Sequence, residues 1–289
     1  MELNNIIFPS PKPSYDNSTF RGETIWIPRA SNPLNHPIPC IYLPCNRGSS
    51  KVLLYFHGNA EDLGLCYHLI EHLRSTLSVH VIGVEYPGYG IYPGKCSAKQ
   101  VLIDADDIFQ YLVQEMHINT RDIIVFGRSI GSGPATWLAA NRNPGALLLM
   151  SAYTSIKAAV KKIAGRLAMK FVKERFKNID LMPKITCPTF LIHGQKDNLI
   201  AWENSQQLHD LCPGPCCLLL PKEMTHNEFD FFDDLSLPFA AFLMQCGISV
   251  NPGAKGDSML RFPESLYIRP ENGENKKKGR WNRFLQRFA

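Results

Sequence analysis

Short apolar runs alternate with longer amphipathic stretches along most of the chain. Apolar runs of about four to eight residues are typical of buried strands, and longer segments with helical spacing indicate helices. The alternation predicts an α/β fold with a mostly parallel central sheet covered by helices on both faces. The expected strands lie at 23–27, 38–43, 51–56, 79–85, 123–126, 145–150, 188–194 and 217–220. The expected helices lie at about 61–77, 98–116, 135–140, 155–177 and 228–245.

The ends of the chain differ from this pattern. Residues 1–20 are rich in proline and are expected to form an extended lead-in to a domain over 21–250. The first two strands are joined by a link too short for a crossover helix, which predicts an antiparallel edge. From Asn251 onward proline, glycine and charged residues dominate. We therefore expect a basic tail over 251–289, disordered over 251–280 and amphipathic at its end.

One strand leads directly into a distinctive turn. The run that ends at Phe126 is followed by Gly127-Arg128-Ser129-Ile130-Gly131, a G-x-S-x-G pattern, and then by helix-forming residues. A strand that turns sharply into a helix holds one residue in a strained conformation, and flanking glycines remove the side chains that would clash. Ser129 should then be exposed at the helix N-terminus, where backbone N–H groups face developing negative charge. Ser129 is the candidate nucleophile.

A serine hydroxyl needs a histidine to take its proton and an acid to orient that histidine. When the serine lies on such a turn, the acid and then the histidine follow later strands. Asp197 follows the strand at 188–194, and His226 follows the strand at 217–220. The sequence predicts a catalytic triad of Ser129, Asp197 and His226.

An oxyanion hole needs two N–H donors close to the nucleophile. The backbone of Ile130 is one expected donor, and that of Asn59, in the loop 57–60, is the other. His57 precedes the serine and is interpreted as part of this donor loop. His193, at the end of a strand, is interpreted as a packing residue. Three acidic residues beyond His226 are expected to be solvated: Asp230, Asp233 and Asp234.

The net charge of +5 is unevenly distributed. Residues 255–289 hold nine basic and four acidic residues, and residues 155–177 hold eight and one. This segregation predicts two basic surfaces. The second segment also carries an apolar stripe, which predicts either a cap over 151–180 beside the active-site mouth or a helix packed on the sheet. The stripe consists of Ile156, Val160, Ile163, Leu167 and Phe171.

The nine cysteines are scattered and lack paired C-x-x-C spacing. They are interpreted as reduced thiols of a cytoplasmic protein. No stretch approaches the roughly 18 apolar residues of a transmembrane helix. The first residues lack the basic start and apolar run of a signal peptide.

Four motifs together resemble the α/β-hydrolase superfamily. They are His57-Gly58-Asn59-Ala60-Glu61-Asp62, Tyr86-Pro87-Gly88-Tyr89-Gly90, the stretch from Gly127 to Ala135, and His226-Asn227-Glu228. The chain is most similar to the α/β hydrolase domain-containing protein 17 group, serine hydrolases that remove palmitate from membrane-bound proteins. The resemblance implies the α/β-hydrolase fold, the triad named above, an acylated protein substrate, and no metal or organic cofactor. The chain departs from the group at Ala201 and Thr225, and it has no cysteine before Cys40.

Other functions fit the same motifs. A lipid esterase or lipase would use identical machinery, and a non-catalytic scaffold could retain the fold. A nucleic-acid role for the basic tail is disfavoured because no recognition module accompanies it.

The end of the chain combines basic and apolar residues at helical spacing. Lys276, Lys277 and Lys278 precede an apolar face made of Trp281, Phe284, Leu285 and Phe288. So short a helix is unstable alone in water but can form on an anionic membrane. We expect peripheral membrane contact at the cytoplasmic face, with docking on a partner protein or no role as alternatives.

Overall fold

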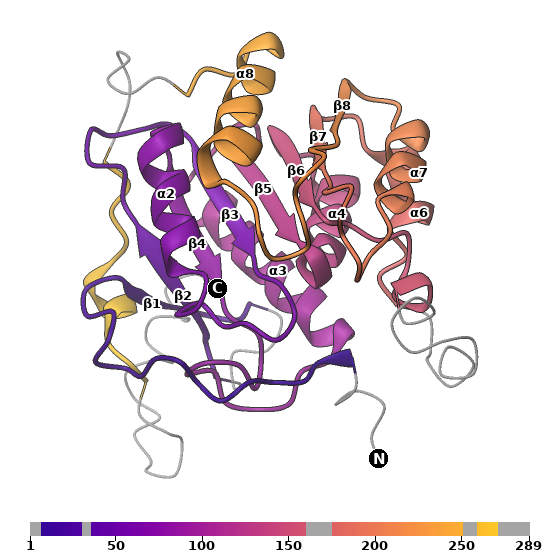
Figure 1. Ribbon diagram of the computed structural model, residues 1–289. Coiled ribbons are helices and arrows are strands. Elements are labelled where there is room, and N and C mark those ends of the chain that lie inside the picture. Colours follow the sequence, from indigo (N-terminus) through magenta and orange to yellow (C-terminus); the bar gives the residue numbers. More distant parts are fainter. Residues whose placement is uncertain (1–6, 31–35, 160–174, 251–258, 271–289) are drawn as a thin grey trace.

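The computed structural model describes residues 7–30, 36–159, 175–250 and 259–270, and these contain one eight-stranded sheet (Figure 1). The strand order is β1-β2-β4-β3-β5-β6-β7-β8. The strands are β1 (Thr24–Ile27), β2 (Ile38–Leu43), β3 (Val52–Phe56), β4 (His80–Val84), β5 (Ile123–Arg128), β6 (Ala146–Met150), β7 (Thr189–Ile192) and β8 (Cys216–Leu219).

Strand pairing follows the predicted pattern. β2 runs antiparallel to both β1 and β4, which confirms the antiparallel edge, and the remaining neighbours are parallel. Side chains alternate between the two faces of the sheet, as strand geometry requires. In β5, Ile123 and Val125 enter one core cluster, while Ile124 and Phe126 enter the other. The central strands are buried on both faces and therefore read as continuous apolar runs.

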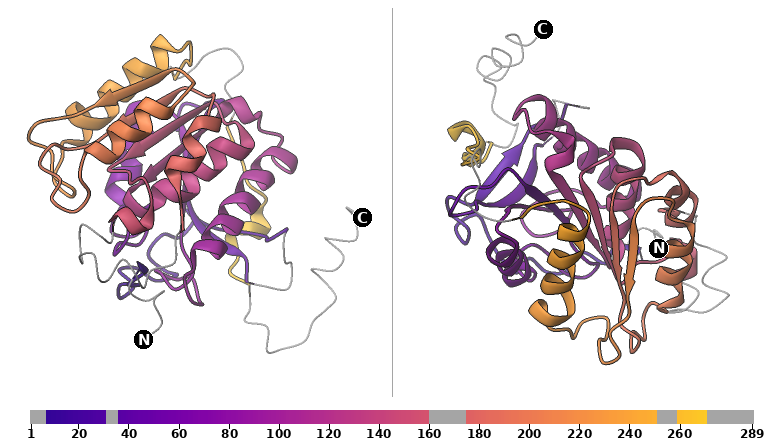
Figure 2. Two further views of the ribbon diagram at one scale, coloured as in Figure 1. Left: turned by 90° about the vertical axis from the view of Figure 1, so that its right-hand side faces the viewer. Right: turned by 90° about the horizontal axis from the view of Figure 1, so that it is seen from above.

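Helices cover both faces of the sheet, with α2 and α8 on one side and α3 and α4 on the other (Figure 2). The helices are α2 (Tyr67–Leu77), α3 (Ala98–Gln114), α4 (Ser132–Arg142), α6 (Asn178–Leu181), α7 (Glu203–Leu211) and α8 (Leu237–Gln245). A π-helical segment, Phe231–Ser236, precedes α8. Short 3-10 segments lie at Thr120–Asp122, Ser129–Gly131, Met182–Lys184 and Glu264–Tyr267.

Two helices begin later than the sequence predicts. The helix expected from 61 begins at Tyr67, because Asp62 accepts hydrogen bonds from Ser14 and from the backbone N–H of Leu65 and so holds this stretch as a loop. The helix expected from 228 begins as π-helix and becomes regular only at Leu237. Pro238 has no N–H to extend the α-helical pattern backward. Most of the predicted cap, residues 160–174, lies outside the described residues.

The expectation of disorder beyond Asn251 is wrong for residues 259–270. Phe262 and Leu266 are buried in the core cluster of the α3 face. The Phe262 ring meets Tyr42 edge-on at 4.8 Å, and the Tyr42 hydroxyl donates to the Leu260 carbonyl at 2.5 Å. These apolar contacts hold a segment that lies within a tail of mostly polar composition.

This segment should contribute measurably to stability. We expect Phe262→Ala to lower the free energy of unfolding by about 3 kcal/mol, because it empties a buried aromatic site. Met259→Ala, at an exposed position of the same segment, should change it by less than about 0.5 kcal/mol. Urea unfolding of both variants measures the difference. Equal stability of the two would show that the segment does not anchor in solution.

Candidate active site

The turn after β5 has the geometry that the sequence predicts. Ser129 has φ of 52°, in the left-handed region, and begins the helical segment that continues into α4. A Cβ at Gly127 would lie 2.3 Å from the carbonyl oxygen of Gly131, and one at Gly131 would lie 2.2 Å from that of Phe56. Both positions therefore require glycine. The turn presses the start of the helix against the end of β3 and leaves Ser129 partly exposed.

The structure brings the three predicted triad residues together from three strand ends. His226 Nε2 lies 3.1 Å from Ser129 Oγ, and His226 Nδ1 lies 2.7 Å from Asp197 Oδ2. A carboxylate only accepts, so Nδ1–H donates to Asp197 and Nε2 is left to accept the serine proton. The loops of the acid and the histidine touch directly, since a Cβ at Gly194 would lie 2.0 Å from the Met224 carbonyl oxygen.

Asp197 lies in a set of donors that favours its charged form. Burial alone would raise the pKa of Asp197, but hydrogen bonds from His193, His226 and the Ile200 backbone hold that pKa well below its ordinary value. His193 is buried, as expected of a packing residue, yet its Nε2 also lies 3.2 Å from Asp197 Oδ2. The carboxylate is therefore ionised and fixed beside His226.

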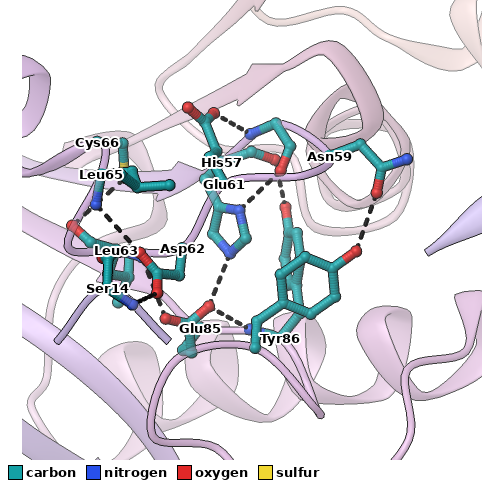
Figure 3. Close-up of polar contacts among 12 residues, drawn as sticks. Ser14, His57, Asn59, Glu61, Asp62, Leu63, Leu65, Cys66, Glu85 and Tyr86 are labelled. Atoms are coloured by element: carbon teal, nitrogen blue, oxygen red, sulfur yellow. Dashed lines mark hydrogen bonds and ion pairs between the residues drawn. The ribbon is translucent and has the colours of Figure 1, made fainter. Parts of the chain in front are cut away.

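The loop after β3 is anchored from below by a buried ion pair (Figure 3). His57 Nδ1 faces the Gly58 carbonyl at 2.8 Å, and Nε2 faces Glu85 Oε1 at 2.9 Å. Both partners are acceptors, because the Glu85 oxygens also receive the backbone N–H groups of Leu63 and Tyr86. We assign His57 as an imidazolium, because a proton on each ring nitrogen satisfies both acceptors and agrees with the raised pKa of His57 beside Glu85.

The two predicted oxyanion donors lie at neighbouring strand ends. Asn59 follows β3 and Ile130 follows β5, and these strands pair in parallel. The Asn59 side chain donates to the Ile7 carbonyl at 2.7 Å and accepts from the Tyr89 hydroxyl at 2.9 Å. These bonds fix the loop through the side chain of Asn59. The catalytic role of the two backbone N–H groups remains a prediction.

Residues near the start of the described chain contact the loops that follow β3 and β4. The Tyr15 hydroxyl donates to Glu85 Oε2 at 2.8 Å, and the Ser14 N–H donates to Asp62 at 2.7 Å. Tyr15 is buried against the core of the α2 face. The expected extended lead-in thus packs beneath the donor loop.

Four charged or titratable contacts near the triad do not follow from the sequence pattern. Glu85 and Glu61 hold the donor loop, Arg128 contacts Glu61, and His193 contacts Asp197. A signal was available for Glu85, because it directly follows β4 just as His57 follows the neighbouring β3. All nine cysteines lie within the described residues, and none of them is paired in a disulfide there.

Solved structures of low identity share this fold. An esterase of Pyrococcus furiosus superposes with a TM-score of 0.64 at 17% identity, covering 82% of this chain and 98% of that one. Mouse α/β hydrolase domain-containing protein 10 superposes with a TM-score of 0.57 at 17% identity, covering 77% and 99%. The fold is therefore that of the α/β hydrolases, as predicted.

Sequence relatives narrow the class to a family, although no protein-family profile matches the chain. α/β hydrolase domain-containing protein 17B of Xenopus tropicalis is 30% identical over 195 residues, which cover 68% of this chain and 67% of that protein. Protein 17C of mouse is 28% identical over 193 residues, covering 67% and 59%. The chain belongs to the α/β hydrolase domain-containing protein 17 family. It is therefore an α/β hydrolase. Over the residues that the structure describes, no helix is long and apolar enough to cross a membrane.

The His57–Glu85 pair predicts a pH dependence of stability. Burial alone would lower the pKa of His57, but the hydrogen bond and charge of Glu85 raise it above its ordinary value. A raised folded-state pKa gives stability that is present below the unfolded pKa of about 6.5 and is lost as pH rises through the folded value. We expect His57→Gln to destabilise by about 1–3 kcal/mol at pH about 5.5, and by less at higher pH.

Urea unfolding at several pH values measures this difference. His68→Gln, at an exposed histidine on α2, is the matched control and should show little effect at any pH. A His57→Gln penalty that did not change with pH would contradict the imidazolium assignment.

Proposed function

We propose that this protein is a serine hydrolase that cleaves acyl esters or thioesters, with Ser129 as nucleophile, His226 as base and Asp197 as its orienting acid. The observation that carries the proposal is the continuous chain of contacts from Ser129 Oγ through His226 to Asp197. The same three residue types in this geometry define a nucleophilic triad irrespective of the fold that holds them.

The chemistry follows from the contacts. His226 Nε2 takes the Ser129 proton while Oγ attacks the carbonyl carbon of the substrate, and the carbonyl oxygen becomes an oxyanion facing Ile130 and Asn59. The tetrahedral species collapses, the bond to the leaving group breaks, and His226 returns its proton to the leaving thiolate or alkoxide. Water then attacks acyl-Ser129 by the same route and releases a carboxylic acid. Asp197 stays ionised and stabilises the transient imidazolium of His226.

We further propose a palmitoylated protein as the substrate and the reaction as depalmitoylation. Membership of the protein 17 family supports this substrate class through the resemblance described above. Hydrolysis of small acyl lipids is the alternative, and it would use the same residues. A panel of palmitoyl-cysteine peptides and monoacylglycerols of equal chain length distinguishes the two by kcat/KM. Preference for the monoacylglycerols would overturn the depalmitoylase proposal and leave the serine-hydrolase proposal intact.

We expect Ser129→Ala to reduce kcat/KM on a soluble acyl thioester by a factor on the order of 10⁴ or more. The variant should remain folded, because the Ser129 hydroxyl makes no core contact and is needed only for attack. Turnover and labelling by a fluorophosphonate probe, which reacts with activated serines, measure the loss.

Ser151 provides a matched control. It follows the adjacent strand β6 with φ of 50°, and its hydroxyl has no hydrogen-bond partner among the described residues. Ser151→Ala should keep wild-type turnover. Near-wild-type activity of Ser129→Ala would refute the serine-hydrolase proposal.

We also propose that the protein reaches its substrate by peripheral membrane contact through Lys276, Lys277, Lys278, Trp281, Phe284 and Phe288. These residues lie outside the described ranges, so the support is their sequence pattern alone. Basic residues near an anionic leaflet contribute roughly 1 kcal/mol each, and the aromatic residues supply apolar depth.

A form that ends at Gly273 should lose co-sedimentation with anionic vesicles, whereas the full chain should bind them in a salt-sensitive manner. Neutral vesicles are the control, because they offer apolar depth without the charge. Equal pelleting of both forms, or of neither, would show that the tail is not the anchor.

A further inference from the structure

Arg128, the residue directly before the candidate nucleophile, contacts two other loops of the site. Its Nη1 donates to Glu61 Oε1 at 2.7 Å. Its Nη2 donates to the backbone carbonyl of His226 at 2.9 Å and to Asn227 Oδ1 at 2.9 Å. The side chain is 9% exposed, and its guanidinium carbon lies 5.9 Å from the centre of the Phe229 ring. The planar guanidinium of Arg128, at the end of β5, thus connects the loop that follows β3 with the loop that follows β8.

The carboxylate of Glu61 extends this connection into the donor loop. Glu61 Oε1 accepts the Gly58 N–H at 2.6 Å as well as the Arg128 donor. A Cβ at Gly58 would lie 2.6 Å from Glu61 Oε1 and 3.0 Å from Arg128 Nη1, so the loop backbone packs directly against the ion pair. The segment 57–61 is not part of a helix or strand. Its position relative to β5 therefore depends on side-chain contacts such as these.

The contact with His226 is to the backbone of the residue whose ring faces Ser129. His226 is thus held at two points, by Arg128 at its carbonyl and by Asp197 at its ring. Arg128 and Ser129 are adjacent in the chain, so the strand that carries the nucleophile also carries the group that holds the base. A lysine has one ammonium group and cannot reproduce the planar fork that reaches both loops.

We propose that Arg128 is a positioning residue, which holds the oxyanion-donor loop through Glu61 and the histidine loop through the His226 carbonyl in register with Ser129. This inference rests on the proposed serine-hydrolase function and deepens it. Arg128 contacts no reacting atom. Its contribution is to the alignment of groups that act in the transition state, and misplacement by about 1 Å can cost on the order of 100-fold in rate.

The test compares Arg128→Met with Arg128→Lys in pre-steady-state acylation by a soluble acyl thioester. Arg128→Met should lower the acylation rate on the order of 100-fold, with KM changed by less than about 3-fold, because substrate binding is left intact while alignment is lost. Arg128→Lys should lie between Arg128→Met and the wild type, since one ammonium group can restore one contact. It also provides a milder variant if Arg128→Met does not fold.

The double variant Arg128→Met/Glu61→Gln separates positioning from stability. Arg128→Met leaves the Glu61 carboxylate with the Gly58 N–H but without its cation, and Glu61→Gln removes that uncompensated charge. We expect the thermal midpoint of the double variant to recover toward the wild type while its acylation rate stays low. Recovery of both would show that Arg128 acts only through stability.

Arg29→Met is the matched control. Arg29 pairs with Asp104 at 3.0 Å and is as buried as Arg128, but its hydrogen-bond partners, Tyr92 and Asp104, belong to neither the triad nor the donor loop. The Arg29→Met variant should have a lower thermal midpoint and an unchanged acylation rate of the folded protein. An Arg128→Met rate within about 3-fold of the wild type, when Ser129→Ala is inactive, would overturn the positioning role alone. Full activity of Ser129→Ala would instead overturn the proposed function on which it rests.

Discussion

The site depends on one close approach between backbones, that of the turn after β5 to the end of β3. Gly131 lies against the carbonyl oxygens of Phe56 and His57 with no space for a Cβ. This contact fixes where the helix starts, and therefore where Ser129 and the first helical N–H groups lie relative to the loop 57–61. A second glycine, Gly194, brings the acid loop equally close to the histidine loop. Both contacts occur at the carboxyl edge of the parallel strands, the usual location of active sites in α/β sheets.

Around these contacts the loops are held by polar groups inside the protein. His57 with Glu85 and Arg128 with Glu61 are two cation–carboxylate pairs below and beside the donor loop. Buried pairs often add little net stability, because desolvation offsets their attraction. Their directional hydrogen bonds do select one loop conformation among many. Such selection suits a segment without regular secondary structure that is proposed to hold an oxyanion donor in a defined direction.

Sequence patterns predict those parts of the structure that depend on residues close together in the chain. The strands, the turn at Ser129 and the positions of Asp197 and His226 after late strands all follow from apolar runs and fixed motif order. The Arg128–Glu61 and His57–Glu85 contacts do not, because their partners lie 67 and 28 residues apart. The only local signal is the position of Glu85 directly after a strand. The burial of Phe262 and Leu266 does not follow from local pattern, because Pro263 and charged residues interrupt the apolar residues of 259–270 and the surrounding tail is polar. The late start of α2 depends on Asp62, whose partner Ser14 lies 48 residues earlier.

The segment 259–270 has a consequence for how this sheet meets other molecules. β1 ends the strand order, and an open terminal strand offers unpaired backbone groups to any other extended chain. The short 3-10 segment at Glu264–Tyr267 packs against β1, and the Arg269 guanidinium lies 5.9 Å from the centre of the Trp26 ring. The returning chain thus shields one edge of the sheet from strand addition. A protein shortened before residue 259 would keep every residue of the proposed triad and yet expose a template for aggregation.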